Sequence, residues 1–175
     1  TSKVRPPKYD NRCDRFLDHE EADKLLNELQ KHSRQVYEMS LVSLHCGLRA
    51  DEIFSLTWGA VNLDQELLTM RDPKGIINRA VYMTGDVKAI VGGKQKGMPN
   101  DPVFPAGGGI KIKQISNTFA KVVEKLDFND GVTDRRQKVT FHTLRHTHAS
   151  WLVMGGVDLY RVQKIMGHAT LAMTQ

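Results

Sequence analysis

Apolar residues recur at helical spacing over the first third of the chain. Asp18 and Glu21 have the spacing of a capping box, and leucines then repeat every three or four positions. A second helix is predicted over Arg34–Cys46, and Gly47 is suited to end it because glycine adopts the left-handed conformation without a steric penalty. A short helix is predicted to follow, over about 50–56.

The pattern changes to short extended segments in the middle of the chain. Leu67–Arg71 and Arg79–Met83 are predicted strands joined by a turn over Asp72–Gly75, and Ala60–Leu63 is a candidate third strand. Residues 91–109 are rich in Gly, Pro and Lys, which predicts a long surface loop. The sheet is therefore expected to be small and antiparallel.

Helical spacing returns in the last third. One helix is predicted over about 113–126, a second from about His142 to Met154, and a third from Asp158 to Gly167. Residues 129–138 are polar and predict a loop, and Thr170 is suited to cap one more helix. The fold class is therefore predicted as mixed α/β, mainly helical with a small three-stranded antiparallel sheet.

Composition places the chain among globular proteins. Its 175 residues fit one domain, and no apolar run approaches the length of a membrane span. The net charge of +5 permits binding to nucleic acid without establishing it. Two cysteines fit a reducing compartment, so we expect a cytoplasmic protein with no membrane partner.

The helix predicted from His142 contains the most informative side chains. His142 and Arg145 share the face opposite Leu144, near a helix N-terminus that favours an anion. A solvated surface explains that pair as well, because exposed charged faces are common. His142, His146 and His148 raise the alternative of a metal, but further ligands at suitable spacing are missing, so no metal is expected.

Four separated motifs, taken in order, resemble the tyrosine recombinases, which are the phage integrase family. The motifs are Gly47-Leu48-Arg49-x-x-Glu52, Lys74 in a hairpin turn, His142-x-x-Arg145 within Phe141–Thr147, and Gly167-His168. The resemblance runs from about Arg15 to Gln175 and implies the recombinase catalytic core over 16–175. It also implies that residues 1–15, with their prolines and basic residues, are a linker from a missing N-terminal DNA-binding domain.

The resemblance carries roles for individual residues. Arg49 and Arg145 match two catalytic arginines that bind the non-bridging oxygens of a phosphodiester, as guanidinium groups suit this geometry. His168 matches a further hydrogen-bond donor to the same group. Glu52 matches an acidic residue that supports the site without contacting the substrate.

Two proton transfers and one nucleophile complete the implied mechanism. Lys74 matches a lysine that protonates the leaving 5′-oxygen, and His142, with a pKa expected near neutrality, exchanges the proton of a tyrosine. That nucleophilic tyrosine is expected just after Gln175, so the chain is interpreted as truncated before it and inactive in cleavage. The tyrosines present all precede His168: Tyr9, Tyr37, Tyr82 and Tyr160.

The implied function is site-specific DNA recombination, such as integration or excision of a prophage or other mobile element, through a 3′-phosphotyrosine intermediate. The implied partners are duplex DNA and three further copies of the protein, in a homo-tetramer on DNA. No cofactor is expected, and the source is expected to be bacterial or phage-encoded. Two alternatives stay open: a non-catalytic DNA-binding regulator that keeps the fold, and DNA relaxation of the type IB topoisomerase kind.

Overall fold

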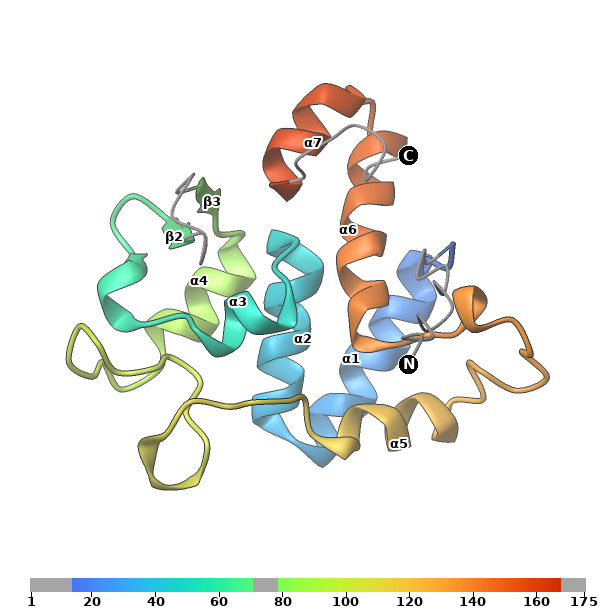
Figure 1. Cartoon of the computed structure of the whole chain (residues 1–175), viewed down its shortest axis with the longest axis horizontal. Helices are drawn as coiled ribbons and strands as arrows, with labels where there is room; N and C mark the ends of the chain where they lie inside the picture. The colour runs from blue at the N-terminus through green and yellow to red at the C-terminus, as the bar shows by residue number, and fades with distance from the viewer. Residues whose placement is uncertain (1–13, 71–78, 168–175) are drawn as a thin grey trace, which may run out of the picture.

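The computed structural model describes residues 14–70 and 79–167. Within them the protein is mainly helical with a small antiparallel sheet (Figure 1). The helices are α1 (His19–His32), α2 (Arg34–Cys46), α3 (Ala50–Phe54), α4 (Gly85–Gly92), α5 (Asn117–Lys125), α6 (Phe141–Met154) and α7 (Leu159–Met166). The strands are β1 (Val61–Asn62), β2 (Leu67–Met70) and β3 (Arg79–Tyr82), and the short 3-10 turns are η1 (Trp58–Ala60), η2 (Gly107–Gly109) and η3 (Arg135–Gln137).

Helix α2 lies at the centre of the molecule. It packs against α1, α4 and α6, while α1 also contacts α5 (Figure 1). The side chains of Leu25, Leu29, Val42 and Leu144 are fully buried where these helices meet. Burying such side chains is the main favourable contribution to folding, so the fold centres on the contacts of α2 with its neighbours.

The helix ends follow the local signals in the sequence. The Asp18 carboxylate accepts a hydrogen bond from the Glu21 N–H at 2.8 Å, and the Glu21 carboxylate accepts one from the Asp18 N–H at 3.1 Å. The predicted capping box is thus confirmed. Gly47 ends α2 with φ at 62°, and Asp158 caps the start of α7, as predicted.

The sheet is antiparallel in the order β1-β2-β3, as predicted. Leu68 pairs with Val81, and both side chains are buried on the core face of the sheet. This register fixes Arg79 opposite Met70, at the first position of β3. The turn predicted between β2 and β3, which contains Lys74, lies outside the described residues.

The surface loop predicted over 91–109 is partly wrong. Helix α4 occupies 85–92 and buries Val87 and Val91 completely. Beyond α4, Phe104 is also fully buried, so the segment that follows is anchored in the core. The two buried positions of α4 are only four residues apart, and the glycines at its two ends weaken the helical pattern in the sequence.

Helix α6 is tied to the start of the described chain. The hydroxyl of Thr147 accepts a hydrogen bond from the Leu17 N–H at 3.0 Å, and the indole N–H of Trp151 donates to the Leu17 carbonyl at 3.1 Å. Both backbone groups of Leu17 are therefore satisfied by side chains of one helix. The position of α6 is fixed relative to α1, which begins two residues later.

Helix α7 buries only part of its apolar side. Leu159, Val162 and Ile165 share one side of the helix, but only Val162 of these three is buried. Met166 is the other buried residue of α7. Within 14–70 and 79–167, every helix is too short or too polar to cross a membrane.

Candidate functional site

Three arginine side chains meet around the carboxylate of Glu52. Arg79 Nη2 donates to both Glu52 oxygens at 2.8 Å each. Arg49 Nη1 lies 3.4 Å from Oε1, and Arg145 Nη1 lies 3.5 Å from Oε2. One carboxylate thus faces three guanidinium groups, which come from the N-terminus of α3, from β3 and from α6. The four side chains together keep an excess of positive charge. We call Arg49, Glu52, Arg79 and Arg145 the arginine cluster.

The turn from α2 into α3 positions Glu52 and Arg49. Gly47 reverses the chain after α2, and Arg49 then caps α3 with an extended backbone. Glu52, in the first turn of α3, accepts a hydrogen bond from the Arg49 N–H at 2.7 Å. This local bond fixes the carboxylate beside the arginine that precedes it by three positions.

Gly47 is required at this turn for two reasons. Its φ of 62° lies in the left-handed region, which other residues adopt only at a cost. A Cβ at this position would also lie 2.6 Å from the His148 ring and 3.0 Å from the Met166 sulfur. The close approach of α2's end to α6 and α7 therefore depends on the absence of a side chain.

Arg145 is the most buried charged side chain of the cluster, with 2% of its surface exposed. Its guanidinium donates to the backbone carbonyls of Gly47 and Met166. Burial lowers the pKa of Arg145 to about 9; Arg49 and Arg79 act in the same direction, and Glu52 opposes them. The group therefore stays charged at neutral pH, held by carbonyls that cannot neutralise it.

The helical wheel misplaces Arg145 relative to the core. His142 and Arg145 were predicted to project from a common face opposite Leu144, yet Arg145 is buried and His142 is exposed. The cause is tertiary, because the Gly47 turn and the end of α7 pack over Arg145. Both residues still belong to one electrostatic environment, since Arg145 and Arg49 act on the pKa of His142.

The near-neutral pKa expected for His142 is wrong for the chain without a ligand. Although its side chain reaches the surface, the protein atoms around the ring remove part of its hydration. This loss of hydration, followed by repulsion from His146, Arg145 and Arg49, lowers the pKa of His142 to about 4. The rings of His142 and His146 meet edge to face with centroids 4.6 Å apart. At neutral pH His142 is therefore uncharged and able to accept a proton.

His148 has a structural role beside the cluster. Its Nδ1 lies 2.9 Å from the Leu44 carbonyl, so Nδ1 carries the proton and donates. Burial lowers the pKa of His148 to about 4, which keeps the ring neutral against the Gly47 turn. Among residues 14–70 and 79–167, no group of three or more His, Cys, Asp or Glu side chains is placed to hold a metal ion.

Arg79 is the member of the cluster that the sequence motifs do not reveal. Besides its two bonds to Glu52, it donates through Nη1 to the Ile165 carbonyl in the last turn of α7. The signal in the sequence is slight: an arginine at the start of a strand, five positions after the turn lysine Lys74. Its partners lie 27 and 86 positions away, which no local pattern reveals.

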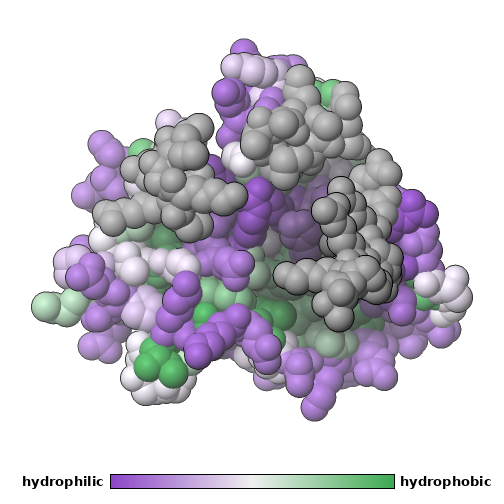
Figure 2. All heavy atoms as spheres, in the orientation of Figure 1, coloured by the Kyte–Doolittle hydropathy of each residue, from purple (hydrophilic) through white to green (hydrophobic). Residues whose placement is uncertain are grey.

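The structure therefore brings together Arg49, Glu52 and Arg145 in direct contact, with His142 close enough to share their charges. Lys74 and His168 lie outside the described residues. The face seen in Figure 2 carries hydrophilic residues in its middle, where α2, α6 and α7 approach one another in Figure 1. Fixed guanidinium groups with one shared carboxylate form a site suited to bind an anion such as a phosphate.

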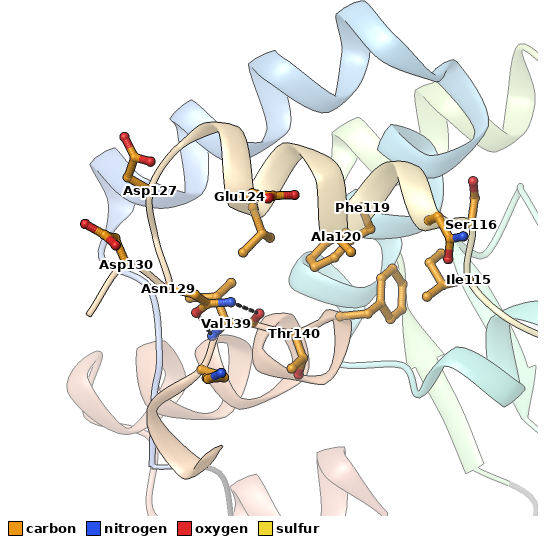
Figure 3. Close-up of a pocket in the computed structure, with 14 residues that line it drawn as sticks. Ile115, Ser116, Phe119, Ala120, Glu124, Asp127, Asn129, Asp130, Val139 and Thr140 are labelled. Atoms are coloured by element: carbon orange, nitrogen blue, oxygen red, sulfur yellow. Dashed lines mark hydrogen bonds between the residues drawn. The ribbon is translucent and has the colours of Figure 1, made fainter. Parts of the chain in front are cut away.

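A pocket of about 700 Å³ lies elsewhere, between α5 and the start of α6 (Figure 3). Its lining includes Phe119, Val123 and Phe141 with carboxylates such as Glu124 and Asp127. None of the arginine cluster lines it. An acidic and apolar pocket does not suit a phosphate, so the pocket and the candidate site are separate features.

Comparison with known proteins decides the family. The model of the phage integrase family matches residues 15–175. The chain belongs to this family. A tyrosine recombinase of Pseudothermotoga lettingae is 30% identical over 177 residues, covering 98% of this chain and 58% of the relative. The integrase of Salmonella phage P22 is 27% identical over 184 residues, covering 98% of this chain and 45% of the relative.

Solved structures of family members have the same fold. The crystal structure of XerA recombinase matches with a TM-score of 0.76 at 26% identity, covering 98% of this chain and 61% of that one. The Tn1549 transposon integrase, solved in complex with a circular intermediate DNA, matches with a TM-score of 0.76 at 19% identity and covers 94% and 61%. The chain thus spans roughly 45–61% of the length of these relatives.

Proposed function

We propose that this chain is the catalytic domain of a tyrosine-type site-specific recombinase that cleaves and rejoins duplex DNA. The observation that carries the proposal is the arginine cluster, in which the fixed guanidinium groups of Arg49 and Arg145 lie beside one shared carboxylate. Membership of the phage integrase family supports the same reaction class. The relatives named above are recombinases and integrases, which favours recombination over supercoil relaxation.

Arg49 and Arg145 stabilise the transition state in this proposal. Attack on a phosphodiester adds negative charge to the non-bridging oxygens, and guanidinium groups already held in place need no reorganisation to meet it. Arg49 is the more accessible of the two, with 39% of its side chain exposed, whereas Arg145 is held by backbone carbonyls. His168 is proposed as a further donor to the same oxygens.

Proton transfer is assigned to His142 and Lys74. The low pKa of His142 results from lost hydration and nearby positive charge, so a bound phosphodiester raises this pKa toward neutrality. His142 thereby becomes a better base for the attacking tyrosine when DNA is present. Lys74 is proposed to protonate the leaving 5′-oxygen.

The nucleophile is proposed to be a tyrosine that follows Gln175 in the longer protein. Its oxygen attacks phosphorus, forms a 3′-phosphotyrosine and releases the 5′-hydroxyl, which later attacks the same phosphorus to restore the DNA. Neither step needs a cofactor or a metal in this scheme. The proposed assembly is a homo-tetramer on two duplexes, in a bacterial cytoplasm, with residues 1–15 linking residues 16–175 to an N-terminal DNA-binding domain.

A nicked suicide duplex tests the proposal. The longer protein, offered a panel of candidate sites, is expected to form a covalent adduct that migrates slowly on a denaturing gel. The 175-residue chain is expected to form none, because a positively charged site without a nucleophile has nothing to place in line with the leaving oxygen. Phe substitution of the proposed tyrosine is the matched control and should abolish the adduct.

Two results would contradict the proposal. An adduct formed by the 175-residue chain would assign the nucleophile to a tyrosine within it, and the exposed Tyr82 and Tyr160 would be the first to replace by Phe. A longer protein that binds its site and forms no adduct would instead indicate a DNA-binding regulator. Supercoil relaxation without any target site would indicate a topoisomerase.

A further inference from the structure

Arg79 makes its hydrogen bonds within the protein. Its Nη2 donates to both oxygens of Glu52, and its Nη1 donates to the Ile165 carbonyl. The side chain is only 13% exposed, and a Cβ on Gly167 would lie 2.9 Å from its Cδ and 3.0 Å from its Nε. Arg79 is therefore enclosed between Glu52 and the end of α7, and its hydrogen bonds join these two parts of the protein.

The three arginines share Glu52 unequally. Arg79 makes the short, two-oxygen contact at 2.8 Å, while Arg49 Nη1 and Arg145 Nη1 lie at 3.4 and 3.5 Å. Short charge-assisted hydrogen bonds to both oxygens are the strong form of an arginine–carboxylate pair. The charge of Glu52 is thus taken up mainly by Arg79, and the other two guanidinium groups keep more of theirs.

The second bond of Arg79 joins distant parts of the chain. It links β3 to the Ile165 carbonyl in the last turn of α7. The next residue of that helix, Met166, accepts a hydrogen bond from Arg145 through its carbonyl. Without Arg79, both the carboxylate and the end of α7 lose a fixed partner at once. Glu52 would then turn toward the remaining cations, because a partly buried carboxylate needs compensation.

We propose that Arg79 is a positioning residue that compensates Glu52 and holds the end of α7, which leaves Arg49 and Arg145 available to a phosphodiester. The role of these two arginines rests on the proposed function. The geometry of the arginine cluster does not rest on the proposed function, so the positioning role of Arg79 can be tested in this chain without DNA. The expected consequence of its loss is a lower rate of cleavage with little change in DNA affinity.

The first test follows the arginine side chains of the 175-residue chain by NMR of their Nε–Hε groups. In R79M the signals of Arg49 and Arg145 are expected to shift, because Glu52 moves onto them. R79K keeps the charge but offers one nitrogen in place of the guanidinium fork, so it replaces only part of the contacts with Glu52 and the Ile165 carbonyl, and smaller shifts are expected. K125M, at an exposed cation outside the cluster, should leave both signals unchanged.

Unchanged Arg49 and Arg145 signals in a folded R79M chain would overturn the inference, whether or not the protein cleaves DNA. Backbone amide spectra establish folding, and R79K provides the same comparison if R79M unfolds. A shift in these signals combined with no adduct from the longer wild-type protein would retain the positioning role and reject the proposed function. The two hypotheses therefore fail separately.

The second test measures cleavage in the longer protein. R79M is expected to slow adduct formation by about 10- to 100-fold at saturating DNA, because displaced guanidinium groups meet the transition state poorly. The double variant R79M/E52Q is expected to recover part of this rate, since no carboxylate remains to draw Arg49 and Arg145 away. A double variant as slow as R79M, or slower, would indicate a purely structural role.

Discussion

Two glutamates of this protein are each surrounded by cations, yet only one of them belongs to a candidate anion site. Glu28 on α1 contacts Lys31 at 2.9 Å, His32 at 3.1 Å and Lys125 of α5. Glu52 is contacted by Arg49, Arg79 and Arg145. Each glutamate contacts three basic side chains, so the number of basic contacts alone does not make an anion site.

The difference lies in what holds the cations. The lysines at Glu28 have 70% and 58% of their side chains exposed, and they exchange readily with water. At Glu52, Arg145 is buried on two backbone carbonyls and Arg79 is bonded to a third. Fixed and dehydrated donors interact strongly with an anion. Mobile, hydrated cations gain little from pairing with an anion.

Exchanging one cation beside Glu52 and one beside Glu28 for the other basic residue is expected to give the largest difference in cleavage rate. R145K in the longer protein should slow adduct formation by about 100- to 1000-fold, because the donors of a lysine share one nitrogen, which cannot reach two carbonyls on different segments and a phosphate as the forked guanidinium does. K125R at Glu28 should leave the rate unchanged. Single-turnover rates on the suicide duplex measure both, and similar losses in the two variants would remove the distinction between the clusters.

A smaller effect is expected from glycine substitutions that separate backbone strain from crowding. Gly47 and Gly131 have nearly the same φ, 62° and 64°, but a methyl group added at Gly47 would have atoms within 4 Å, whereas one added at Gly131 would face open space. Both Ala variants lose about 1–2 kcal/mol to the left-handed conformation. G47A should lose about 1–3 kcal/mol more, because the methyl group meets His148 and Met166.

Urea denaturation of the two variants measures that difference as the gap between their free energies of unfolding. Equal losses in G47A and G131A would mean that the approach of His148 and Met166 to the Gly47 turn is loose. The arginine cluster would then lack the close packing that is proposed to fix Arg145.

The smallest effect is expected at Glu28 and depends on pH. Its pKa is lowered from 4.5 to about 2, first by the hydrogen bond from Lys125 and then by that from Lys31. The resulting stabilisation is complete above pH 4.5 and is lost as the pH falls toward 2. The stability gap between wild type and E28Q should therefore be constant near neutrality and shrink in acid, as measured by denaturation at a series of pH values.

High salt provides a second test of whether Glu28 stabilises the protein through its charge. The lysine partners of Glu28 are exposed to solvent and are screened by added salt, so the gap between wild type and E28Q should narrow in concentrated sodium chloride. A gap that is insensitive to both pH and salt would show that Glu28 acts by packing, not by charge. Glu28 would then resemble Glu52 in being fixed by its surroundings.

Local signals account for the parts of the fold that the sequence predicted well. Asp18, Gly47 and Asp158 act on neighbours within a few positions, so their effect on helix ends is visible in the sequence. Helix α4 was missed although Thr84 caps it, with its hydroxyl 3.5 Å from the Val87 N–H. Its glycines and its length of eight residues give a weak pattern, and burial against α2 stabilises it.

The candidate site was predictable only in part for a similar reason. The motifs that contain Arg49, Glu52, His142 and Arg145 were visible in the sequence. In the structure, Arg49 and Arg145 both contact Glu52. Arg79 was missed, and the burial of Arg145 was missed, because both depend on the end of α7. Contacts across 21 to 86 positions arise from packing, which periodicity does not encode.

The bonds between Leu17 and α6 have a consequence for the order of folding. They close a chain loop of 130 positions, and the entropy of closing it is lost before these contacts contribute. A nascent chain that has not yet reached α6 has neither this closure nor Arg145, and one that stops before Met166 lacks a carbonyl that holds Arg145. The arginine cluster therefore cannot assemble until the chain has been made through the end of α7.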